Sequence, residues 1–323
     1  MSIIRVSNDS LPDDSMNSES IDQSRIAYLL ETLQAHSPAM LDTFPISKII
    51  TAFDELPPEA NYTCIPEPVT STWETIAHDH GPEGFSLYQK VTMLTLMRDF
   101  QARTHIRNYT PATLACYAKS FSRIMDQIED RKFTEYDRIN DLLIKDLSLC
   151  RQKMFSVGAQ LAEDHSGLPR NLLLKAGTAQ AFRFLKTTLL TRHGFSNYYQ
   201  IHTHLLELAD FTPEGWDAAM KWLAEMLLIN PDVKGVFGAS WFFDPALKEI
   251  SPRLEYLSNA LLDRGAVRFY SHEDADSGAL ATSATRKRLH ESGQYNPGIY
   301  FIIWPRRTAL RWLAAERNKE AQS

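Results

Sequence analysis

The stretch TPEGWDAAMKWLAEMLLINPDVKGVFGASWFF, residues 212–243, decides the fold class of this chain. It opens with residues that favour a helix start, namely an N-cap, a first-turn proline and an acid at the positive helix end: Thr212, Pro213 and Glu214. Large apolar residues then recur along one face, which predicts a helix over 213–229. The apolar run at 233–243 contains two glycines and predicts a buried strand. A helix that leads into a buried strand is typical of α/β domains.

The same order of helix and strand recurs toward the C-terminus. A helix predicted over 252–264 ends at a glycine and leads into a strand over 266–271. A shorter helix over 283–293 leads into the apolar strand 299–304, and a helix over 308–319 follows it. Three such units in succession predict a sheet with helices packed on it.

The residues before this segment divide into a helical part and a part with strand signals. Two strands are predicted within 154–174, a helix over 178–192 and a strand over 198–208. Helical spacing dominates earlier, with helices predicted from residue 26 to a loop at 56–68 and then over 86–107, 111–129 and 134–150. The sequence therefore predicts an α+β fold with three regions: a flexible N-terminus at 1–22, a helical region at 23–150 and a mixed-sheet α/β domain at 151–323.

The composition excludes several classes of protein. Of the 323 residues, 44% are hydrophobic, which is enough for a buried core, and the net charge of -6 argues against nucleic acid or an anionic membrane as partner. The N-terminus lacks a signal peptide pattern, and no apolar run is long enough to span a bilayer, so we expect a cytoplasmic protein. The three cysteines, Cys64, Cys116 and Cys150, follow no metal or disulfide spacing.

His202 and His204 form the first candidate site. In a strand, residues two apart point to the same face, so both imidazoles could reach one metal ion. A third ligand would come from a distance, with Asp210, Asp244 or His272 as the options. Satisfied or merely polar histidines are the alternative, because a catalytic metal normally needs three protein ligands.

The residues that end the predicted strand 233–243 form the second candidate site. Polar groups at the end of an apolar α/β strand often bind ligands, and here Ser240, Trp241 and Phe243 precede Asp244. The aromatic rings could cover a substrate, and Asp244 could accept a proton. Alternatively, the rings belong to the core and Asp244 caps the turn before Pro245.

Two short basic clusters form the third candidate site. Arg286, Lys287 and Arg288 lie in the helix before the last strand, and Arg306-Arg307 follow that strand. If these five cations converge, they suit a phosphate, as in a nucleotide or coenzyme A. A solvated charged face is the alternative. The chain has no P-loop, dinucleotide-binding, nucleophile-elbow or kinase motif.

The order of elements over 150–305 resembles the C-terminal half of GNAT-superfamily acyltransferases. SPRLEYLSNALLDRGAVRFY, residues 251–270, is similar to the late helix of that family, which passes into a strand through a glycine. The family holds the acyl-CoA pyrophosphate on a Gly-rich loop that opens the helix after the central strand. At that place this chain has Asp210 to Gly215, with two acids and a proline.

The resemblance implies a small-molecule acyltransferase that uses acyl-CoA and an amine or similar acceptor. The candidate general base is Asp244, His202 or His204, Ser240 with Trp241 and Phe243 would bind substrate, and Arg286 with Arg288 would contact phosphate. One alternative is a metal-dependent hydrolase or oxygenase that uses His202 and His204. The other is a non-enzymatic binding or regulatory protein with an exposed apolar patch over 86–150. The oligomeric state stays open.

Overall fold

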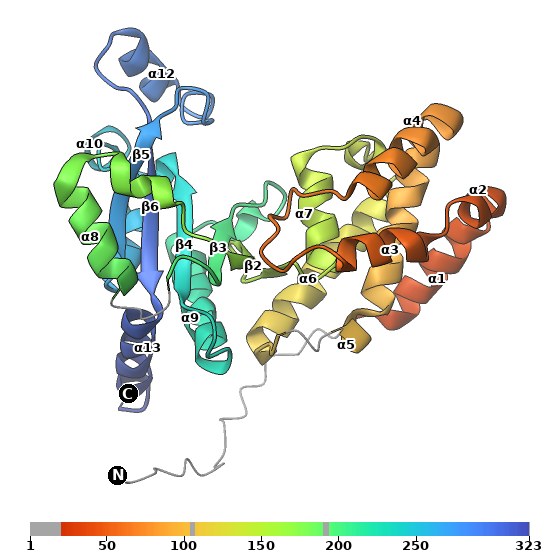
Figure 1. Cartoon of the computed structure of the whole chain (residues 1–323), viewed down its shortest axis with the longest axis horizontal. Helices are drawn as coiled ribbons and strands as arrows, with labels where there is room; N and C mark the ends of the chain where they lie inside the picture. Colours follow the sequence, from red (N-terminus) through yellow and green to blue (C-terminus); the bar gives the residue numbers. More distant parts are fainter. Residues whose placement is uncertain (1–20, 104–106, 190–193, 323) are drawn as a thin grey trace.

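The computed structural model describes residues 21–103, 107–189 and 194–322, and it confirms the predicted α+β fold with N-terminal helices (Figure 1). Most of the predicted flexible segment 1–22 lies outside the described residues. Helices fill the chain as far as Cys150, and the first strand begins at Met154. Among the described residues, no helix is both long enough and apolar enough to cross a bilayer.

The N-terminal half is a bundle built around one long helix, α4. Its helices are α1 (Gln23–Gln34), α2 (Pro38–Thr43), α3 (Ile46–Asp54), α4 (Glu67–Arg98), α5 (Phe100–Arg103), α6 (Pro111–Glu129) and α7 (Asp141–Cys150), with a short 3-10 turn at Glu135–Asp137. Helix α4 bends at Gly81, which directly precedes Pro82. The φ of Gly81, 68°, lies in the left-handed region that glycine adopts without strain. After the bend, α4 is buried on most sides, which makes it the centre of the bundle.

Local capping explains why the predicted starts of two helices are correct. The Thr110 hydroxyl accepts a hydrogen bond from the Thr113 amide at 3.2 Å, and α6 then starts at Pro111. The Thr212 hydroxyl does the same for the Gly215 amide at 3.1 Å. Helix α9 (Pro213–Ile229) therefore has the bounds that its sequence predicts.

The C-terminal half is a six-stranded mixed sheet. Its strands are β1 (Met154–Ser156), β2 (Leu161–Ser166), β3 (Tyr198–His202), β4 (Gly235–Ser240), β5 (Val267–Glu273) and β6 (Gly298–Pro305). They are arranged in the order β1-β2-β3-β4-β6-β5. Strands β3 and β4 pair in parallel and are joined by α9, whereas the other neighbouring strands pair antiparallel. The parallel pair therefore lies in the middle of the sheet.

Helices cover both faces of this sheet, because each central strand is apolar on both sides. Val236 and Ile302 pack toward α9, α11 (Tyr256–Leu262) and α13 (Arg306–Glu320). Phe237 and Ile303 instead pack toward α8 (Gly177–Leu189). The remaining short elements are α10 (Leu247–Ile250), α12 (Ala284–Glu291) and the 3-10 turns Arg170–Leu174, Leu208–Asp210, Trp241–Phe243 and Pro252–Leu254.

The structure corrects two sequence predictions around the first hairpin. The segment 163–170 was expected to be a loop between two strands, but its first half belongs to β2 (Leu161–Ser166), and the strand predicted after it, at 171–176, is largely a 3-10 turn. The polar residues of β2 are buried because they have partners: Glu163 bonds His202, and Asp164 bonds Arg107 at 2.7 Å. Partners distant in sequence thus allow this acidic segment to be buried as a strand.

Candidate functional site

A cavity of about 300 Å³ lies where the two parallel strands part. The pairing of β3 with β4 ends at Ile201 and Gly238, and β4 continues to Ser240 beside β6. The divergence leaves space at the carboxyl ends of both strands, where ligand sites of α/β sheets usually lie. The polar lining of this cavity comes from several elements: Lys145, Gln160, Gln200, His202, Thr203 and Ser240. We call it the strand-end cavity.

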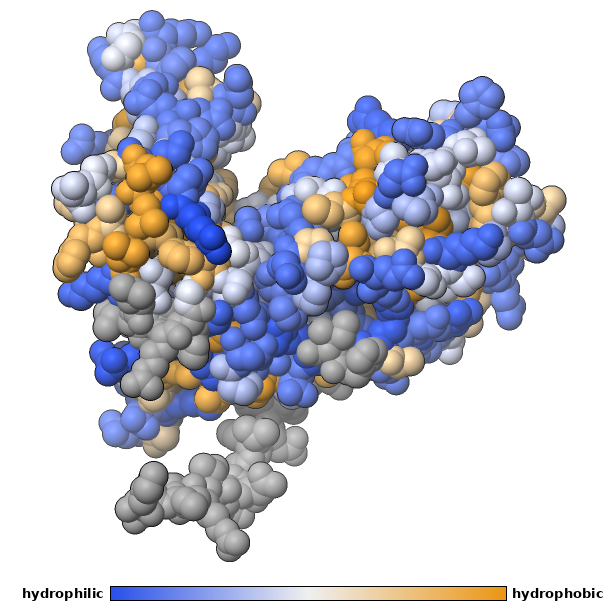
Figure 2. Space-filling view, viewed as in Figure 1, coloured by the Kyte–Doolittle hydropathy of each residue, from blue (hydrophilic) through white to orange (hydrophobic). Residues whose placement is uncertain are grey.

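The strand-end cavity lies between the two halves of the molecule. Lys145 belongs to α7 of the helical bundle, whereas Ser277 precedes α12 at the far end of the sheet. Figure 2 shows the surface hollowed between the lobe that carries α12 and the lobe of the N-terminal helices. A ligand in this cavity would therefore touch both halves.

His202 lines the strand-end cavity beside a buried carboxylate. Its Nε2 lies 3.0 Å from Oε2 of Glu163, a carboxylate that is completely buried. This hydrogen bond assigns the ring proton of a neutral imidazole to Nε2, so Nδ1 carries the lone pair. The ring also contacts Tyr62 edge-on, with ring centres 4.8 Å apart. The side chain of His202 is 13% exposed, so the imidazole is oriented but still reachable.

Donors from three segments surround the side chain of Glu163. Besides His202, it accepts a hydrogen bond from the Tyr62 amide at 2.8 Å and lies 3.5 Å from the Lys153 ammonium. A buried carboxylate needs such donors, since burial without them would be very unfavourable. Glu163 therefore orients the imidazole and would stabilise it when it takes up a proton.

Lys145 supplies a cation to the wall of the cavity. Its ammonium donates to Oδ2 of Asp141 at 2.6 Å and to the Thr203 carbonyl at 2.9 Å. Two of its three N–H donors are thus used, and one is left for a ligand. Burial alone would raise the pKa of Asp141, but the hydrogen bonds from Lys145 and Tyr62 lower it. The wall therefore carries an ion pair with spare donor capacity.

His204 does not share the site with His202. Strand β3 ends at His202, so the rule that residues two apart face the same side no longer applies at His204. Its Nε2 lies 3.1 Å from Asp146, and its Nδ1 accepts a hydrogen bond from the Leu206 amide at 3.2 Å. Each imidazole thus faces its own carboxylate, and the expected pairing of the two histidines on one metal ion is wrong. Within the described residues, no three His, Cys, Asp or Glu side chains are placed to hold a metal.

The residues after β4 form the aromatic wall of the cavity. Ser240 Oγ accepts a hydrogen bond from the Phe242 amide at 3.1 Å and caps the turn Trp241–Phe243. Trp241 and Phe243 line the cavity but are almost fully buried, so they shape it and exclude water. The structure therefore brings the predicted substrate residues Ser240, Trp241 and Phe243 to the same cavity as His202.

Asp244 has a different position from the one expected of a base. Its carboxylate accepts hydrogen bonds from the Ala246 amide at 2.9 Å, the Gly298 amide at 3.0 Å and the Tyr295 hydroxyl at 3.3 Å. Three donors occupy it, and it does not line the strand-end cavity. Asp244 thus holds the turn after β4 against the start of β6, which agrees with the alternative that it caps the turn.

The two basic clusters do not converge. Helix α12 precedes β6 and α13 follows it, so Arg286 and Arg306 lie at opposite ends of that strand (Figure 1). Arg286 is 1% exposed, donates to the Ala279 carbonyl and lies over the Trp241 ring. Arg288 is exposed on α12. The expected five-cation phosphate site is therefore wrong, because a whole strand separates its halves.

The start of α9 does not fit a pyrophosphate. The Gly215 and Trp216 amides already donate to the hydroxyl and the carbonyl of Thr212. A Cβ at Gly215 would lie 2.1 Å from the Asp210 carbonyl, so the preceding turn packs directly on the helix start. The Asp210 carboxylate adds negative charge, which an ion pair with Lys119 offsets. Phosphate would find the Gly215 and Trp216 amides occupied and the space beside Gly215 filled by the preceding turn.

A second cavity, of about 770 Å³, lies between α6 and α9. Its lining is mainly apolar and small, as shown by Ala112, Ala115, Leu206, Ala218 and Trp222. This size and this lining are typical of sites for small apolar molecules. We call it the α6–α9 cavity.

The reactive groups in the α6–α9 cavity are engaged or suppressed. Burial raises the pKa of the Cys116 thiol to about 12, which makes it a poor nucleophile at neutral pH. Lys119 pairs with Asp210 at 2.5 Å, and Arg123 pairs with Asp146 at 2.6 Å. The cavity is therefore suited to binding rather than to covalent chemistry.

Sequence reasoning missed Glu163, Lys145 and Tyr62. The only available signal was the run Glu163-Asp164-His165 next to apolar residues, since acids between apolar positions must find partners when they are buried. Lys145 lies 58 residues from Thr203 along the chain and Tyr62 lies 140 residues from His202, so no local pattern marks them.

No protein-family model matches the chain, and comparisons with curated proteins and with solved structures give no match.

Proposed function

We propose that this chain is an enzyme that transfers an acyl group from a thioester to the amine of a small polar molecule in the strand-end cavity. The observation that carries the proposal is His202, which Glu163 orients by a 3.0 Å hydrogen bond at the end of the parallel strand pair. An imidazole with one nitrogen hydrogen-bonded to a carboxylate and a lone pair on the other can act as a general base.

The sheet supports acyl transfer as the reaction class. Two antiparallel strands precede one parallel pair, a helix joins that pair, and two antiparallel strands follow. The resemblance to GNAT-superfamily acyltransferases rests on the order of the helices and strands along the chain. Fold does not determine chemistry, so the reaction class rests on this analogy, whereas the roles of the residues rest on the site.

The proposed reaction uses groups that line the cavity. The amine nitrogen attacks the thioester carbonyl, a C–N bond forms, and the C–S bond breaks. Nδ1 of His202 takes the amine proton and then gives it to the departing thiolate, which returns the imidazole to its neutral form. The free N–H of Lys145 would stabilise the negative charge that develops on the carbonyl oxygen. Trp241 and Phe243 limit the access of water, which would otherwise hydrolyse the thioester.

The closed start of α9 restricts the donor. Because no phosphate fits there, we expect the protein to recognise the acyl and thiol parts of the thioester rather than a nucleotide. Acyl-CoA and the matching thioester of N-acetylcysteamine, which lacks the nucleotide, should then react with similar kcat/KM.

The test is an aminolysis assay with acetyl and longer acyl thioesters of both thiols against a panel of amines, with product identified by mass spectrometry. His202→Gln should lower the rate by about 10²- to 10⁴-fold, the usual contribution of a general base. His78→Gln, at a fully solvated histidine on α4, serves as control and should leave the rate unchanged. A turnover that survives His202→Gln would remove His202 from the mechanism.

A second candidate function is the binding of a small apolar molecule in the α6–α9 cavity. The specific observation is its volume of about 770 Å³ together with walls of small apolar side chains. Binding to the native state must raise the melting temperature. Ala115→Trp would fill the cavity and abolish that rise, whereas Ala176→Trp, at an exposed position, would not. A rise that Ala115→Trp leaves intact would rule out this cavity.

A further inference from the structure

Four cations gather around a cavity at the outer edge of the sheet. The cavity, of about 430 Å³, lies between α8, α13 and the edge strand β5, and its lining contains no carboxylate. The cations are Arg183, Lys186, Arg307 and Arg311. All four are exposed, and none forms an ion pair with a residue that the structure describes. In a chain of net charge -6 this concentration of positive charge is unusual. We call it the basic groove.

The spacing of these cations brings like charges together. Arg183 and Lys186 are three apart on α8, and Arg307 and Arg311 are four apart on α13, so each pair shares one helix face. Like charges at these spacings destabilise a helix, in contrast to the Glu–Lys pairs that surfaces usually carry. Two such pairs line one cavity, where an anion would offset their mutual repulsion.

The backbone of α13 adds to the positive field. Its N-cap is Pro305, which has no side-chain cap, and the Arg306 amide donates to the Lys234 carbonyl at 2.8 Å. The following amides belong to the first turn of the helix, whose N–H groups point away from the helix and favour anions. Thr308, in this turn, lines the cavity together with Arg307.

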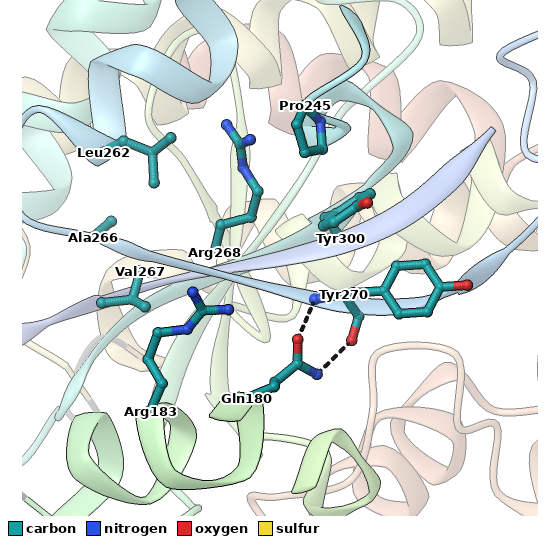
Figure 3. Close-up of a pocket in the computed structure, with 9 residues that line it drawn as sticks. All are labelled: Gln180, Arg183, Pro245, Leu262, Ala266, Val267, Arg268, Tyr270 and Tyr300. Atoms are coloured by element: carbon teal, nitrogen blue, oxygen red, sulfur yellow. Dashed lines mark hydrogen bonds between the residues drawn. The ribbon is translucent and has the colours of Figure 1, made fainter. Parts of the chain in front are cut away.

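A second cavity extends the basic groove along β5. It measures about 480 Å³ and shares Arg183 and Val267 with the first cavity. Figure 3 shows Arg183 and Arg268 on opposite sides of the strand, with Tyr270 and Tyr300 further along. Arg268 Nε is buried and has no hydrogen-bond partner among the described residues. This second cavity thus runs around the edge of β5, with Arg183 on one face and the rings of Tyr270 and Tyr300, 5.4 Å apart, on the face of Arg268.

Gln180 keeps this groove in shape. Its side-chain amide accepts from the Tyr270 amide at 2.9 Å and donates to the Tyr270 carbonyl at 2.8 Å, as a neighbouring strand would (Figure 3). These bonds fix α8 against the edge strand and occupy backbone groups that would otherwise invite pairing with another chain. The walls of the groove are therefore held before a ligand binds.

The basic groove is separate from the strand-end cavity. Pro305, at its α13 end, pairs with Gly235 at the start of β4, whereas Ser240 at the other end of β4 lines the strand-end cavity. A ligand at the four cations thus occupies the opposite end of the sheet from His202. Binding at this groove therefore does not depend on the proposed acyl transfer.

We propose that the basic groove binds the polyphosphate group of a soluble ligand. Arg and Lys side chains with helix N–H groups are the donors that phosphate oxygens prefer, and four unpaired cations match a di- or triphosphate better than a single phosphate. The ligand is either inorganic polyphosphate or a nucleotide whose ring lies toward Tyr270 and Tyr300.

Isothermal titration calorimetry with sodium triphosphate and with ATP tests this proposal on the full chain. Both probes should bind, and raising the salt from about 50 to about 300 mM should weaken the binding. Arg307→Gln/Arg311→Gln should raise Kd by at least about tenfold, because charge-assisted hydrogen bonds are lost. The control Arg131→Gln/Lys132→Gln removes the same charge at an exposed turn and should leave Kd unchanged.

The two probes separate the possible sources of the phosphate. Tighter binding of ATP than of triphosphate identifies a nucleotide site, and equal binding identifies a polyphosphate site; both support the proposal. Lys186→Gln removes a charge from the α8 wall and provides a second variant, should the α13 variant melt at a lower temperature. The proposal is overturned if neither probe binds, or if the groove variants bind as tightly as the unchanged chain.

Discussion

The surroundings of Asp146 and of Glu163 differ, although each buried carboxylate holds one histidine. Asp146 accepts hydrogen bonds from Arg123 at 2.6 Å, Tyr136 at 2.7 Å and His204 at 3.1 Å. Both ring nitrogens of His204 are used, and its side chain is 1% exposed. His204 therefore has no ring nitrogen left to offer a ligand, and its role in this network is structural.

The pair of Glu163 and His202 is different, because a ligand can still reach the histidine; we call it the open pair. His202 has a hydrogen bond on one ring nitrogen, lines a cavity and is 13% exposed. A carboxylate–histidine pair is therefore not in itself a sign of catalysis. The difference lies in whether the second ring nitrogen is occupied and whether the ring reaches a cavity.

The largest loss of stability is expected when the hydrogen-bond network of Asp146, Arg123, Tyr136 and His204, here called the closed network, is broken. Asp146→Ala leaves the Arg123 charge and the His204 donor without their buried partner, and we expect the free energy of unfolding to fall by about 3–5 kcal/mol. Urea unfolding measures this loss. Asp42→Ala, at an exposed position on α2, is the matched control and should change stability by less than about 0.5 kcal/mol. A loss as small as that of the control would show that the network does not support the fold.

A smaller effect is expected at His204. His204→Leu leaves one lone pair of Asp146 and the Leu206 amide without their partner, which should cost about 1–3 kcal/mol. Equilibrium unfolding of His204→Leu beside His202→Leu makes the comparison, and the His204 variant should be the less stable of the two. The opposite order would mean that the open pair, not the closed one, holds the fold.

Lowering the pH should reduce the stability that the closed network contributes. Burial alone would raise the pKa of Asp146, but Arg123 and His204 lower it well below its ordinary value. A lowered native pKa stabilises the fold above the unfolded pKa of about 3.9, and this stabilisation is lost as the pH falls, by at most about 1.4 kcal/mol per pH unit for one group. The stability gap between the unchanged chain and Asp146→Asn should therefore narrow below about pH 4. A gap that widens in acid would contradict the assignment.

The smallest change in the free energy of unfolding is expected for a substitution of His202, in the open pair. In His202→Gln the side-chain amide can still donate to Glu163, which also keeps the Tyr62 amide and Lys153, so stability should change by less than about 1 kcal/mol. Thermal unfolding checks this value. A much larger loss would indicate that His202 is a structural residue like His204.

The parts of the fold that depend on nearby residues were predicted from the sequence, and those that depend on distant partners were not. Thr110 and Thr212 lie next to the helices that they cap, so the starts of α6 and α9 follow from local pattern. Strand β2 was missed because Glu163 and Asp164 become acceptable in a sheet only through partners such as Arg107. Local pattern holds no information on such partners.

The candidate site divides in the same way. Ser240 and Trp241 were placed at a cavity because the end of a buried strand in an α/β sheet is a recurrent ligand position. The pairing of His202 with His204 failed because it assumed that the strand continues past His202. Lys145 could not be found at all, since α7 reaches the cavity only through the packing of the two halves.

The central claim is that His202 presents a free ring nitrogen to a cavity and His204 does not. Diethyl pyrocarbonate acylates accessible, unprotonated imidazole nitrogens, and peptide mass spectrometry locates the product. At neutral pH, native protein should be modified at His202, more slowly than at the solvated His78, and His204 should react only after unfolding. Equal reactivity of His202 and His204 in the native protein would contradict the account.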